Sequence, residues 1–406
     1  MTQLGCIADD FTGATDVAAA FTSAGHRTVV TIGVPEGPVP GADAVVVALK
    51  SRTAPVADAV RESLAAARAL RALGASRYYF KYCSTFDSTP DGNIGPVADA
   101  LLAELGLGLG VVVPSFPANG RRVFQGCLFV HDQPLDESSM RHHPLTPMTD
   151  ASLLRLLAPQ TTSRVELVPL QVVHDETALP ATLASLADGA TPTLAVLDAV
   201  DDGDLARIAR ALPEHTLLTG GAGLAGALAG ADRGPEPIGF PAGARLVVAG
   251  SASAATREQV AVAGGEIPSV QVDRAALPTA FDEEVARLFD VVRSGGDRPV
   301  LVYATASLDD LAGGARHAEL IERCLARVTV SAVAGGVRRV VVAGGETAGA
   351  VTAALGVRQL AIGPSIAPGV VWSSAATADG TRVALALKSG NFGGPRLFLD
   401  AWDVLG

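Results

Sequence analysis

Charged side chains follow several apolar segments of this chain, and their types fit the binding of a small anionic molecule. Asp9 and Asp10 follow the first apolar segment, and Lys50 and Arg52 follow the third. A carboxylate can accept a proton from a hydroxyl group, whereas ammonium and guanidinium groups neutralise anions. Further polar residues end or follow the fourth and fifth segments: Lys81, Ser84, Thr85, Asp87, Asn119, Gly120 and Arg121.

The acidic residues allow two interpretations. Asp9 and Asp10 precede a predicted helix, and Asp often caps a helix N-terminus, as Thr12 or Thr15 could also do. Two adjacent acids capping one helix would be redundant, so we expect one of them to have a chemical role. Asp87 lies among hydroxyl residues, and for it a side-chain-stabilised turn and a chemical role are equal alternatives.

Lysine is rare in this sequence. Only three of the 31 basic residues are lysines: Lys50, Lys81 and Lys388. Each lies at the end of an apolar strand-like segment beside hydroxyl residues. The alternative is that these three lysines occur by chance on solvated surfaces and have no function. A chain that uses Arg almost everywhere is expected to keep Lys where a compact ammonium, and not a planar guanidinium, must contact a single oxygen atom. We therefore expect the three lysines to be functional.

The second half of the chain contains three junctions between apolar segments and glycines. Glycines after a strand let backbone amides approach an anion, and the following helix N-terminus favours negative charge. The three junctions together predict a phosphate or nucleotide site that includes Ser251, Ser253, Ala343, Gly344, Gly345, Glu346, Thr347, Lys388 and Gly390. Neither a G-x-x-x-x-G-K-[ST] loop nor a G-x-G-x-x-G fingerprint after a strand is present, which disfavours P-loop ATPases and ordinary dinucleotide dehydrogenases.

Metal and redox chemistry find little support in the sequence. His131, His142 and His143 lie in a Pro-containing polar stretch, where loop-packing histidines are favoured over metal ligands. The four cysteines are scattered without C-x-x-C spacing. The metal ligands, if any, stay unassigned.

The composition excludes several general partners. With 31 basic and 42 acidic residues, the net charge of −11 disfavours nucleic acid and anionic membranes. No uncharged apolar run reaches the ~18 residues of a membrane span. The sequence begins without a basic region or cleavage site, so we expect a cytoplasmic protein.

Apolar β-rich segments alternate with helical patterns, which is typical of parallel α/β sheets. One set of predicted strands covers 4–8, 29–33, 44–49, 78–82, 111–113, 194–198 and 216–219, with a helix over 55–73. A Gly- and Pro-rich linker over 231–243 separates it from predicted strands at 245–249, 270–272, 300–304, 340–343 and 383–387. We therefore predict two Rossmann-like domains, 1–235 and 243–406, with mainly parallel sheets and ligands in the cleft between them. An anion site in one domain and a phosphate site in the other are the layout of a kinase.

The sequence also resembles the four-carbon acid sugar kinases. The matching segments are 7–16 (IADDFTGATD), 49–52 (LKSR), 79–89 (YFKYCSTFDST), 92–95 (GNIG), 119–121 (NGR), 143–148 (HPLTPM), 250–253 (GSAS), 344–347 (GGET), 366–369 (IAPG) and 387–393 (LKSGNFG). They follow in order along nearly the whole chain, and the segment 81–95 is most similar to the 3-oxo-tetronate branch.

The resemblance implies an N-terminal sugar-acid domain, a C-terminal nucleotide domain, and ATP-dependent phosphorylation of the C4 hydroxyl of a 3-oxo-tetronate. A D-threonate or D-erythronate 4-kinase is the alternative within the family, and a non-catalytic sugar-acid-binding protein is the alternative outside it. The partners are then the four-carbon sugar acid and ATP, and a homodimer is possible.

Kinase chemistry adds roles for these residues. Mg²⁺ is expected to bridge oxygens of ATP. Asp10, or otherwise Asp9, is expected to accept the proton of the attacking hydroxyl. Lys81 is expected to be catalytic as well, and together with Lys50, Arg52 and Arg121 it is expected to neutralise the acid substrate. Ser84, Thr85, Asp87, Asn119 and Gly120 complete the predicted acid site, while Lys388 belongs to the ATP site.

Overall fold

The computed structural model of the chain describes residues 3–142, 146–230, 238–306 and 314–405. The chain forms two compact units, Met1–Pro235 and Glu236–Gly406, here called the N-terminal and C-terminal units. Of the predicted linker, residues 231–237 lie outside the described residues, as does His143.

The main sheet of the N-terminal unit is parallel throughout its described strands. In spatial order it contains β2 (Thr28–Ile32), β3 (Ala44–Ala48), β1 (Leu4–Ala8), β4 (Arg77–Lys81), β11 (Leu217–Gly220), β5 (Leu109–Val113), β10 (Thr193–Leu197) and β9 (Arg164–Val168). Every residue of β1, β3, β5 and β10 is buried. Continuous burial explains why these strands are apolar runs rather than alternating sequences.

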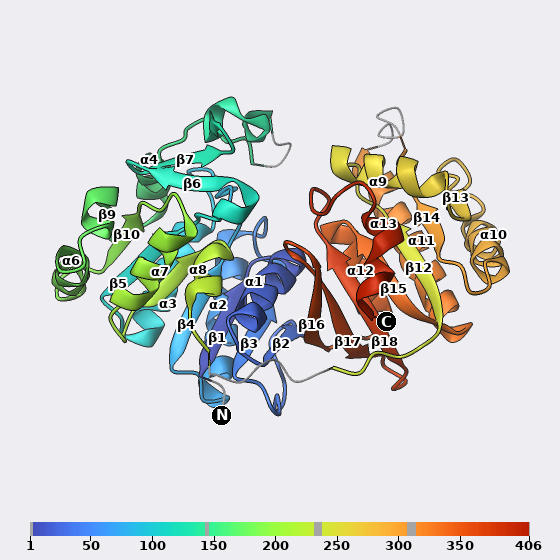
Figure 1. Cartoon of the computed structure of the whole chain (residues 1–406), viewed down its shortest axis with the longest axis horizontal. Helices are drawn as coiled ribbons and strands as arrows, with labels where there is room; N and C mark the ends of the chain where they lie inside the picture. Colours follow the sequence, from blue (N-terminus) through green and yellow to red (C-terminus); the bar gives the residue numbers. More distant parts are fainter. Residues whose placement is uncertain (1–2, 143–145, 231–237, 307–313, 406) are drawn as a thin grey trace. The chain divides into compact units, whose positions relative to one another are not determined.

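Helices cover both faces of this sheet (Figure 1). Their bounds are α1 (Phe11–Ser23), α2 (Val56–Ala72), α3 (Ile94–Leu105), α4 (Leu153–Leu157), α5 (Leu170–Val173), α6 (Ala178–Ala187), α7 (Asp202–Ala211) and α8 (Gly223–Ala227). Helix α8 packs against α1 and α7, whereas α2 packs against α3 on the other face. Pro55 and Leu73, the ends of the predicted helix, are the residues that flank α2.

A small antiparallel sheet of β6 (Arg121–Phe124), β7 (Cys127–Val130) and β8 (Gln133–Pro134) joins the N-terminal unit. Buried Asp198 follows β10 directly. It holds the turn between β6 and β7 by accepting hydrogen bonds from the backbone N–H groups of Gln125 (2.8 Å) and Gly126 (2.9 Å). Burial raises the pKa of Asp198 despite these bonds. These strands and β9 were not predicted, because they are short and carry mixed polarity.

The sheet of the C-terminal unit is mixed. In spatial order it contains β13 (Ser269–Gln271), β14 (Val300–Tyr303), β12 (Ala244–Ala249), β15 (Val337–Ala343), β18 (Arg382–Lys388), β17 (Val370–Ala376) and β16 (Gln359–Ala367). The first five strands are parallel, and β17 is antiparallel to both of its neighbours. The α/β class and the mostly parallel sheets are therefore confirmed. The prediction missed β16 and β17; in β16, Gly363 and Pro364 are turn signals within the strand.

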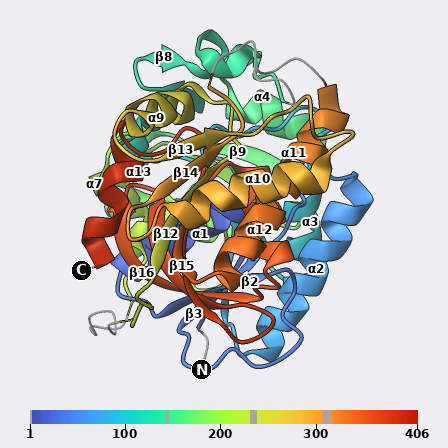
Figure 2. The same ribbon diagram turned by 90° about the vertical axis from the view of Figure 1, so that its right-hand side faces the viewer.

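Helices also cover both faces of the C-terminal sheet. They are α9 (Ala254–Gly264), α10 (Phe281–Ser294), α11 (Gly314–Ala334), α12 (Gly345–Ala354) and α13 (Leu397–Asp400). Helix α10 crosses in front of the strands in Figure 2 and packs against α11. Helix α13 packs against α9, and the core beside it contains Trp372 and Trp402, whose ring centroids are 5.5 Å apart.

Each sheet contains one place where neighbouring parallel strands send the chain in opposite directions. The connection after β1 leads to β2 on one side, and the connection after β4 leads to β5 on the other. In the C-terminal sheet, β12 and β15 are the corresponding neighbours, leading to β13 and β16. Such switch points open a crevice at the carboxyl ends of the strands, where α/β proteins bind ligands.

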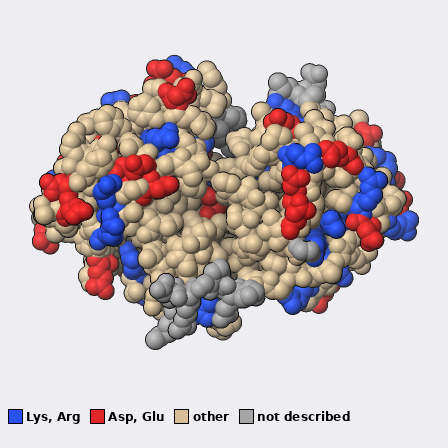
Figure 3. Space-filling view, in the orientation of Figure 1, with Lys and Arg blue, Asp and Glu red and all other residues tan. Residues whose placement is uncertain are grey.

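Within the described ranges, the longest helices are too short or too polar to cross a membrane. Acidic and basic side chains are interspersed on the face shown in Figure 3. That face therefore offers no continuous basic surface for a polyanion.

Gly220 gives a test of the N-terminal fold. Its φ is +147°, and a Cβ atom there would lie 2.0 Å from the Val113 carbonyl oxygen. Gly220→Ala should lower the free energy of unfolding by roughly 2–4 kcal/mol, measured by urea unfolding with circular dichroism. Gly37→Ala, where a Cβ meets nothing within 4 Å, is the matched control and should be neutral. Equal stability of the two variants would contradict this packing.

Candidate functional site

Arg52 links the carboxylates at the switch point of the N-terminal unit. Its Nε donates to Asp9 Oδ2 (3.0 Å), and its Nη2 donates to Asp9 Oδ1 (2.7 Å) and Asp10 Oδ1 (2.9 Å). Its Nη1 lies 4.0 Å from Asp87 Oδ2. The guanidinium expected to hold a substrate carboxylate is thus engaged by acids of the protein itself.

The backbone places Arg52 there. The N–H groups of Ser51 and Arg52 both donate to the Asp9 carbonyl oxygen, which continues the pairing of β1 with β3 beyond the strand ends. Asn93, at the start of α3, donates through Nδ2 to the carbonyl oxygens of Ser51, Arg52 and Ala54 at 2.8–3.1 Å. Asn93 belongs to the Gly-Asn-Ile-Gly motif, yet sequence reasoning did not assign it this positioning role.

Asp9 and Asp10 differ in exposure and in the direction of their pKa shifts. Burial raises the pKa of Asp9, and Arg52 only partly opposes it. Burial also acts on Asp10, but Arg52, Lys81 and a hydrogen bond from Thr12 outweigh it and lower the pKa of Asp10. Asp10 caps α1 by accepting the Gly13 N–H (2.8 Å). Its side chain is 26% exposed against 7% for Asp9, so Asp10 is the more accessible carboxylate.

Lys81 is buried beside a third acid. Its Nζ donates to the Tyr82 carbonyl oxygen (3.0 Å) and lies 3.8 Å from Asp16 Oδ2. Burial raises the pKa of Asp16 to about 6, although the charges of Lys81 and Arg121 oppose the shift. Sequence reasoning missed Asp16; its signal is that it is the only charged residue in the otherwise uncharged α1.

The segment after β4 forms a tight turn. Thr85 Oγ1 donates to Asp87 Oδ1 (2.7 Å), and the backbone of Asp87 has a φ of +39°. Thr85 and Asp87 are buried, and Ser84 is half-buried. Asp87 is therefore part of a side-chain-stabilised turn and also lies near Arg52.

The remaining predicted acid-site residues approach from other elements. Arg121, the first residue of β6, donates to the Asn119 carbonyl oxygen, while its buried Nε has no hydrogen-bond partner within the described residues. Gly120 has a φ of +72°, and a Cβ there would lie 2.3 Å from His131 Nδ1. Lys50 is exposed two residues after β3. The structure therefore brings Arg121 close enough for its charge to act on Asp16, while Lys50 is an exposed residue.

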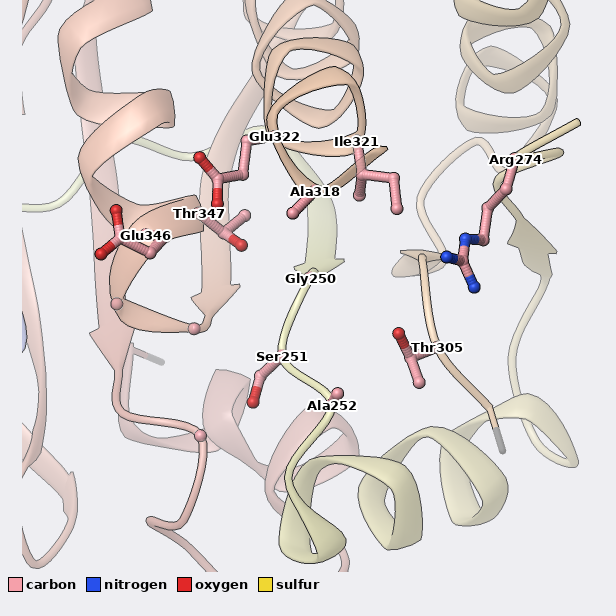
Figure 4. Close-up of a pocket in the computed structure, with 13 residues that line it drawn as sticks. Gly250, Ser251, Ala252, Arg274, Thr305, Ala318, Ile321, Glu322, Glu346 and Thr347 are labelled. Carbon is pink, nitrogen blue, oxygen red and sulfur yellow. The ribbon is translucent and has the colours of Figure 1, made fainter. Parts of the chain in front are cut away.

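The switch point of the C-terminal unit contains a cavity of about 360 Å³ (Figure 4). Its lining residues are Gly250, Ser251, Ala252, Arg274, Thr305, Ala318, Ile321, Glu322, Gly344, Gly345, Glu346, Thr347 and Gly390. Figure 4 shows Arg274 on the side of the cavity opposite Glu322 and Glu346. The cavity combines glycine backbone, hydroxyl groups and charges of both signs.

Two lining glycines leave no room for a side chain, and a third has a backbone conformation that favours glycine. A Cβ would lie 2.1 Å from Thr347 Oγ1 at Gly250, and 2.3 Å from Ser251 Oγ at Gly390. Gly344, whose φ is +123°, precedes α12 directly after β15. Backbone N–H groups at such a strand-to-helix turn suit phosphate oxygens.

Three further predicted residues, Ser253, Ala343 and Lys388, do not line the cavity but contact or adjoin residues that do. Ser253 caps α9, since its Oγ accepts the Thr256 N–H (3.2 Å). Ala343 is the last residue of β15 and pairs with Lys388, the buried last residue of β18.

Sequence reasoning missed several lining residues. Arg274 and Thr305 follow β13 and β14, so the rule that ligands contact residues after parallel strands could have found them. Ala318, Ile321 and Glu322 come from the N-terminal half of α11, and no local signal marks them.

The comparisons with known proteins agree with this division of sites. A model of a sugar-binding N-terminal domain matches residues 4–228, and a model of a nucleotide-binding C-terminal domain matches residues 246–398. A 3-oxo-tetronate kinase from Cupriavidus necator is 49% identical, over 99% of this chain and 97% of its own. The chain belongs to the four-carbon acid sugar kinase family. The Salmonella typhimurium 3-oxo-tetronate kinase, 41% identical over 99% of both chains, is another member similar to it.

Solved structures of family members share the fold. A Salmonella typhimurium protein provisionally described as a tRNA synthase matches with a TM-score of 0.90 and 40% identity, covering 99% of both chains. A Haemophilus influenzae protein matches with a TM-score of 0.82 and 38% identity, covering 99% of this chain and all of its own.

Arg52→Ala tests the charge network. The change leaves Asp9 and Asp10 buried without their cation, which should lower the free energy of unfolding by roughly 3–5 kcal/mol at neutral pH. Loss of Arg52 removes an interaction that lowers the folded-state pKa values of both Asp9 and Asp10, so the folded variant binds more protons than the folded wild type. Its deficit in stability against the wild type should therefore grow as the pH rises through and above the ordinary range of carboxyl groups, measured by chemical unfolding at each pH.

Arg61→Ala is the control for Arg52→Ala. Arg61 forms an exposed ion pair with Asp58, and such pairs are worth ~1 kcal/mol or less. If Arg52→Ala cost no more than Arg61→Ala, the network would not be holding the buried acids.

Proposed function

We propose that this protein is an ATP-dependent kinase that phosphorylates the C4 hydroxyl of a 3-oxo-tetronate. The observation that carries the proposal is the full-length similarity, at 40–49% identity over 99% of this chain, to proteins named 3-oxo-tetronate kinase. The separate anion-binding residues of the two units support it.

The proposed domain assignment is supported by the two family models, which match residues 4–228 and 246–398. Residues 1–235 bind the sugar acid and residues 243–406 bind ATP. In the C-terminal domain, the backbone N–H groups of the first turn of α12, which begins at Gly345, receive the phosphates. The Gly344 N–H instead donates to the Lys388 carbonyl oxygen (3.0 Å), and Gly344 and Gly390 let the phosphates approach the backbone. Ser251 and Thr347 add hydroxyl groups to this cradle.

The donor set of the cavity also fits Mg²⁺. No group of three or more His, Cys, Asp or Glu residues suited to a metal occurs in the part of the chain that is described. Mg²⁺ commonly takes one or two carboxylates together with substrate phosphates, and Glu322 and Glu346 are the carboxylates of the cavity. Bound there, the ion would neutralise charge on the phosphates.

Cationic side chains of the N-terminal domain bind the acid substrate. Arg121, whose buried Nε has no hydrogen-bond partner within the described residues, offers a guanidinium to the acid substrate. Lys50 adds an exposed ammonium, and Lys81 supplies a compact ammonium for a single oxygen. Arg52 acts by holding Asp9 and Asp10 in place. This division revises the expected carboxylate-binding role of Arg52, because its Nε and Nη2 already donate to protein carboxylates.

Asp10 accepts the proton of the attacking hydroxyl in this proposal. It is ionised at neutral pH and more exposed than Asp9. Its bonds to Gly13 and Arg52 fix the carboxylate in direction, which is the requirement for a base that must meet one hydroxyl. Asp9 is the alternative base.

The substrate assignment is tested by ADP release with a panel of four-carbon acids. Turnover should be fastest with a 3-oxo-tetronate, and the product should be the 4-phosphate, as identified by NMR. Faster turnover with D-threonate or D-erythronate would show that the protein is a D-threonate or D-erythronate 4-kinase instead. If no acid caused release of ADP, the proposed kinase activity would be refuted, and a non-catalytic sugar-acid-binding protein would be the remaining interpretation.

Asp10→Asn tests the base. The change keeps the size and much of the capping capacity but removes the charge, and kcat should fall by ~10²–10⁴ in a protein with a wild-type circular dichroism spectrum. Asp9→Asn is the paired variant and should lose less, because the more buried carboxylate is not the acceptor. Wild-type kcat in both variants would exclude these two carboxylates as the base.

A further inference from the structure

Lys388 is a buried ammonium group with neutral partners. Its relative exposure is 0%. Its Nζ donates to Thr256 Oγ1 (2.9 Å) and to the Gly390 carbonyl oxygen (3.1 Å), and it lies 5.7 Å from the centre of the Phe398 ring. No ion pair of Lys388 occurs among the described residues, whereas Lys81, the other buried lysine, has Asp16 beside it.

Three donors converge on one carbonyl oxygen next to the cavity. The Gly390 oxygen accepts from Ser253 Oγ (2.6 Å), Thr256 Oγ1 (2.8 Å) and Lys388 Nζ (3.1 Å). The next residues of this loop are held as well, because Gln259 Nε2 donates to the carbonyl oxygens of residues 392, 393 and 394 at 3.0–3.1 Å. Helix α9 and Lys388 therefore fix the loop that brings Gly390 to the cavity wall.

The described part of the chain does not compensate the charge of Lys388. Its contacts are the Thr256 hydroxyl on α9, the Gly390 carbonyl group and the Phe398 ring on α13, and Ala343 is its neighbour on β15. Burial alone lowers the pKa of Lys388 to about 7, with no contribution from acids such as Glu346 of the cavity. An uncompensated buried charge costs several kcal/mol.

A bound nucleotide would supply the missing negative charge, since Gly390 lines the cavity and Lys388 lies directly behind it. We propose that Lys388 is a positioning residue of the nucleotide site, which holds the Gly390 loop directly and through Thr256 and receives its counter-charge from the phosphates of the nucleotide. The inference rests on the proposed binding of ATP to this cavity. It assigns to Lys388 a role behind the cavity wall in place of direct contact with ATP.

Proton uptake is the measurable consequence. Phosphate charge near the ammonium raises its pKa on binding, so the proton taken from solvent binds at Nζ. Because burial lowers the pKa of Lys388 to about 7, its side chain should carry less charge at pH 8 than at pH 6. Binding of ATP should therefore take up more protons through this residue at pH 8 than at pH 6, and the affinity for ATP should fall as the pH rises.

Calorimetry of the full chain with MgATP, in buffers of different ionisation enthalpy, measures this uptake. Lys388→Met keeps the length of the side chain but removes the charge, and should abolish the part of the uptake and of the pH dependence that belongs to Lys388. Protonation of ATP itself cancels in the difference between wild type and variant. Arg382→Met removes a positive charge at the opposite end of β18 and should keep the wild-type uptake.

Lysine NMR gives a readout that does not depend on catalysis. With ¹³C at Cε of lysine, three lysines give three signals, and Lys388→Met assigns one of them. In the free protein this signal should titrate near pH 7, and ATP should move its midpoint upward. A midpoint near the ordinary value of 10.5 in the free protein would overturn the inference.

The outcomes separate this inference from the proposed function. If ATP binds but wild type and Lys388→Met take up the same number of protons, the role of Lys388 is wrong and the kinase assignment stands. If ATP does not bind the wild-type chain, the nucleotide site itself is wrong and the inference falls with it. Thr256→Val, which removes one bond to Lys388 but no charge, should weaken ATP binding while keeping proton uptake.

Discussion

Two pairs of adjacent parallel strands, β1 with β4 and β12 with β15, determine where chemistry is possible in this protein. At each pair the chain departs in opposite directions, so no crossover covers the strand ends and the residues that follow them stay accessible. Asp9 and Asp10 follow β1, and Lys81 ends β4. Gly250 follows β12, and Gly344 follows β15. The same topology thus produces an ionised site in one unit and a backbone-lined site in the other.

The two sites solve the problem of buried charge in opposite ways. In the N-terminal unit, acids and bases compensate each other: Arg52 is shared by Asp9 and Asp10, and Lys81 lies near Asp16. Such a site is charged yet nearly neutral as a whole, which suits a polar substrate with hydroxyl and carboxylate groups. In the C-terminal unit the cavity is lined largely by glycine backbone and small residues, and in the function proposed above the phosphates of the nucleotide complete the balance of charge.

Local signals explain which features the sequence could predict. Most buried parallel strands are continuous apolar runs, so β1 was located to the residue and the other predicted strands to within three residues. The residues after these strands could be listed as candidates, because parallel topology gathers them without further information. The partner of each candidate could not be predicted: that Arg52 binds Asp9, or that Asn93 holds Arg52, depends on side-chain packing between segments about 40 residues apart. Glu322 was equally inaccessible, since it reaches the cavity from the N-terminal half of a helix.

The distribution of aromatic residues divides the protein optically. Both tryptophans, Trp372 and Trp402, pack together in the core of the C-terminal unit, whereas three of the four tyrosines, Tyr78, Tyr79 and Tyr82, lie on or next to β4 in the N-terminal unit. Fluorescence excited selectively in tryptophan therefore originates in the C-terminal unit alone. Tyrosine emission originates mainly in the other unit. Events in the two halves of the chain can be followed separately in the unlabelled protein.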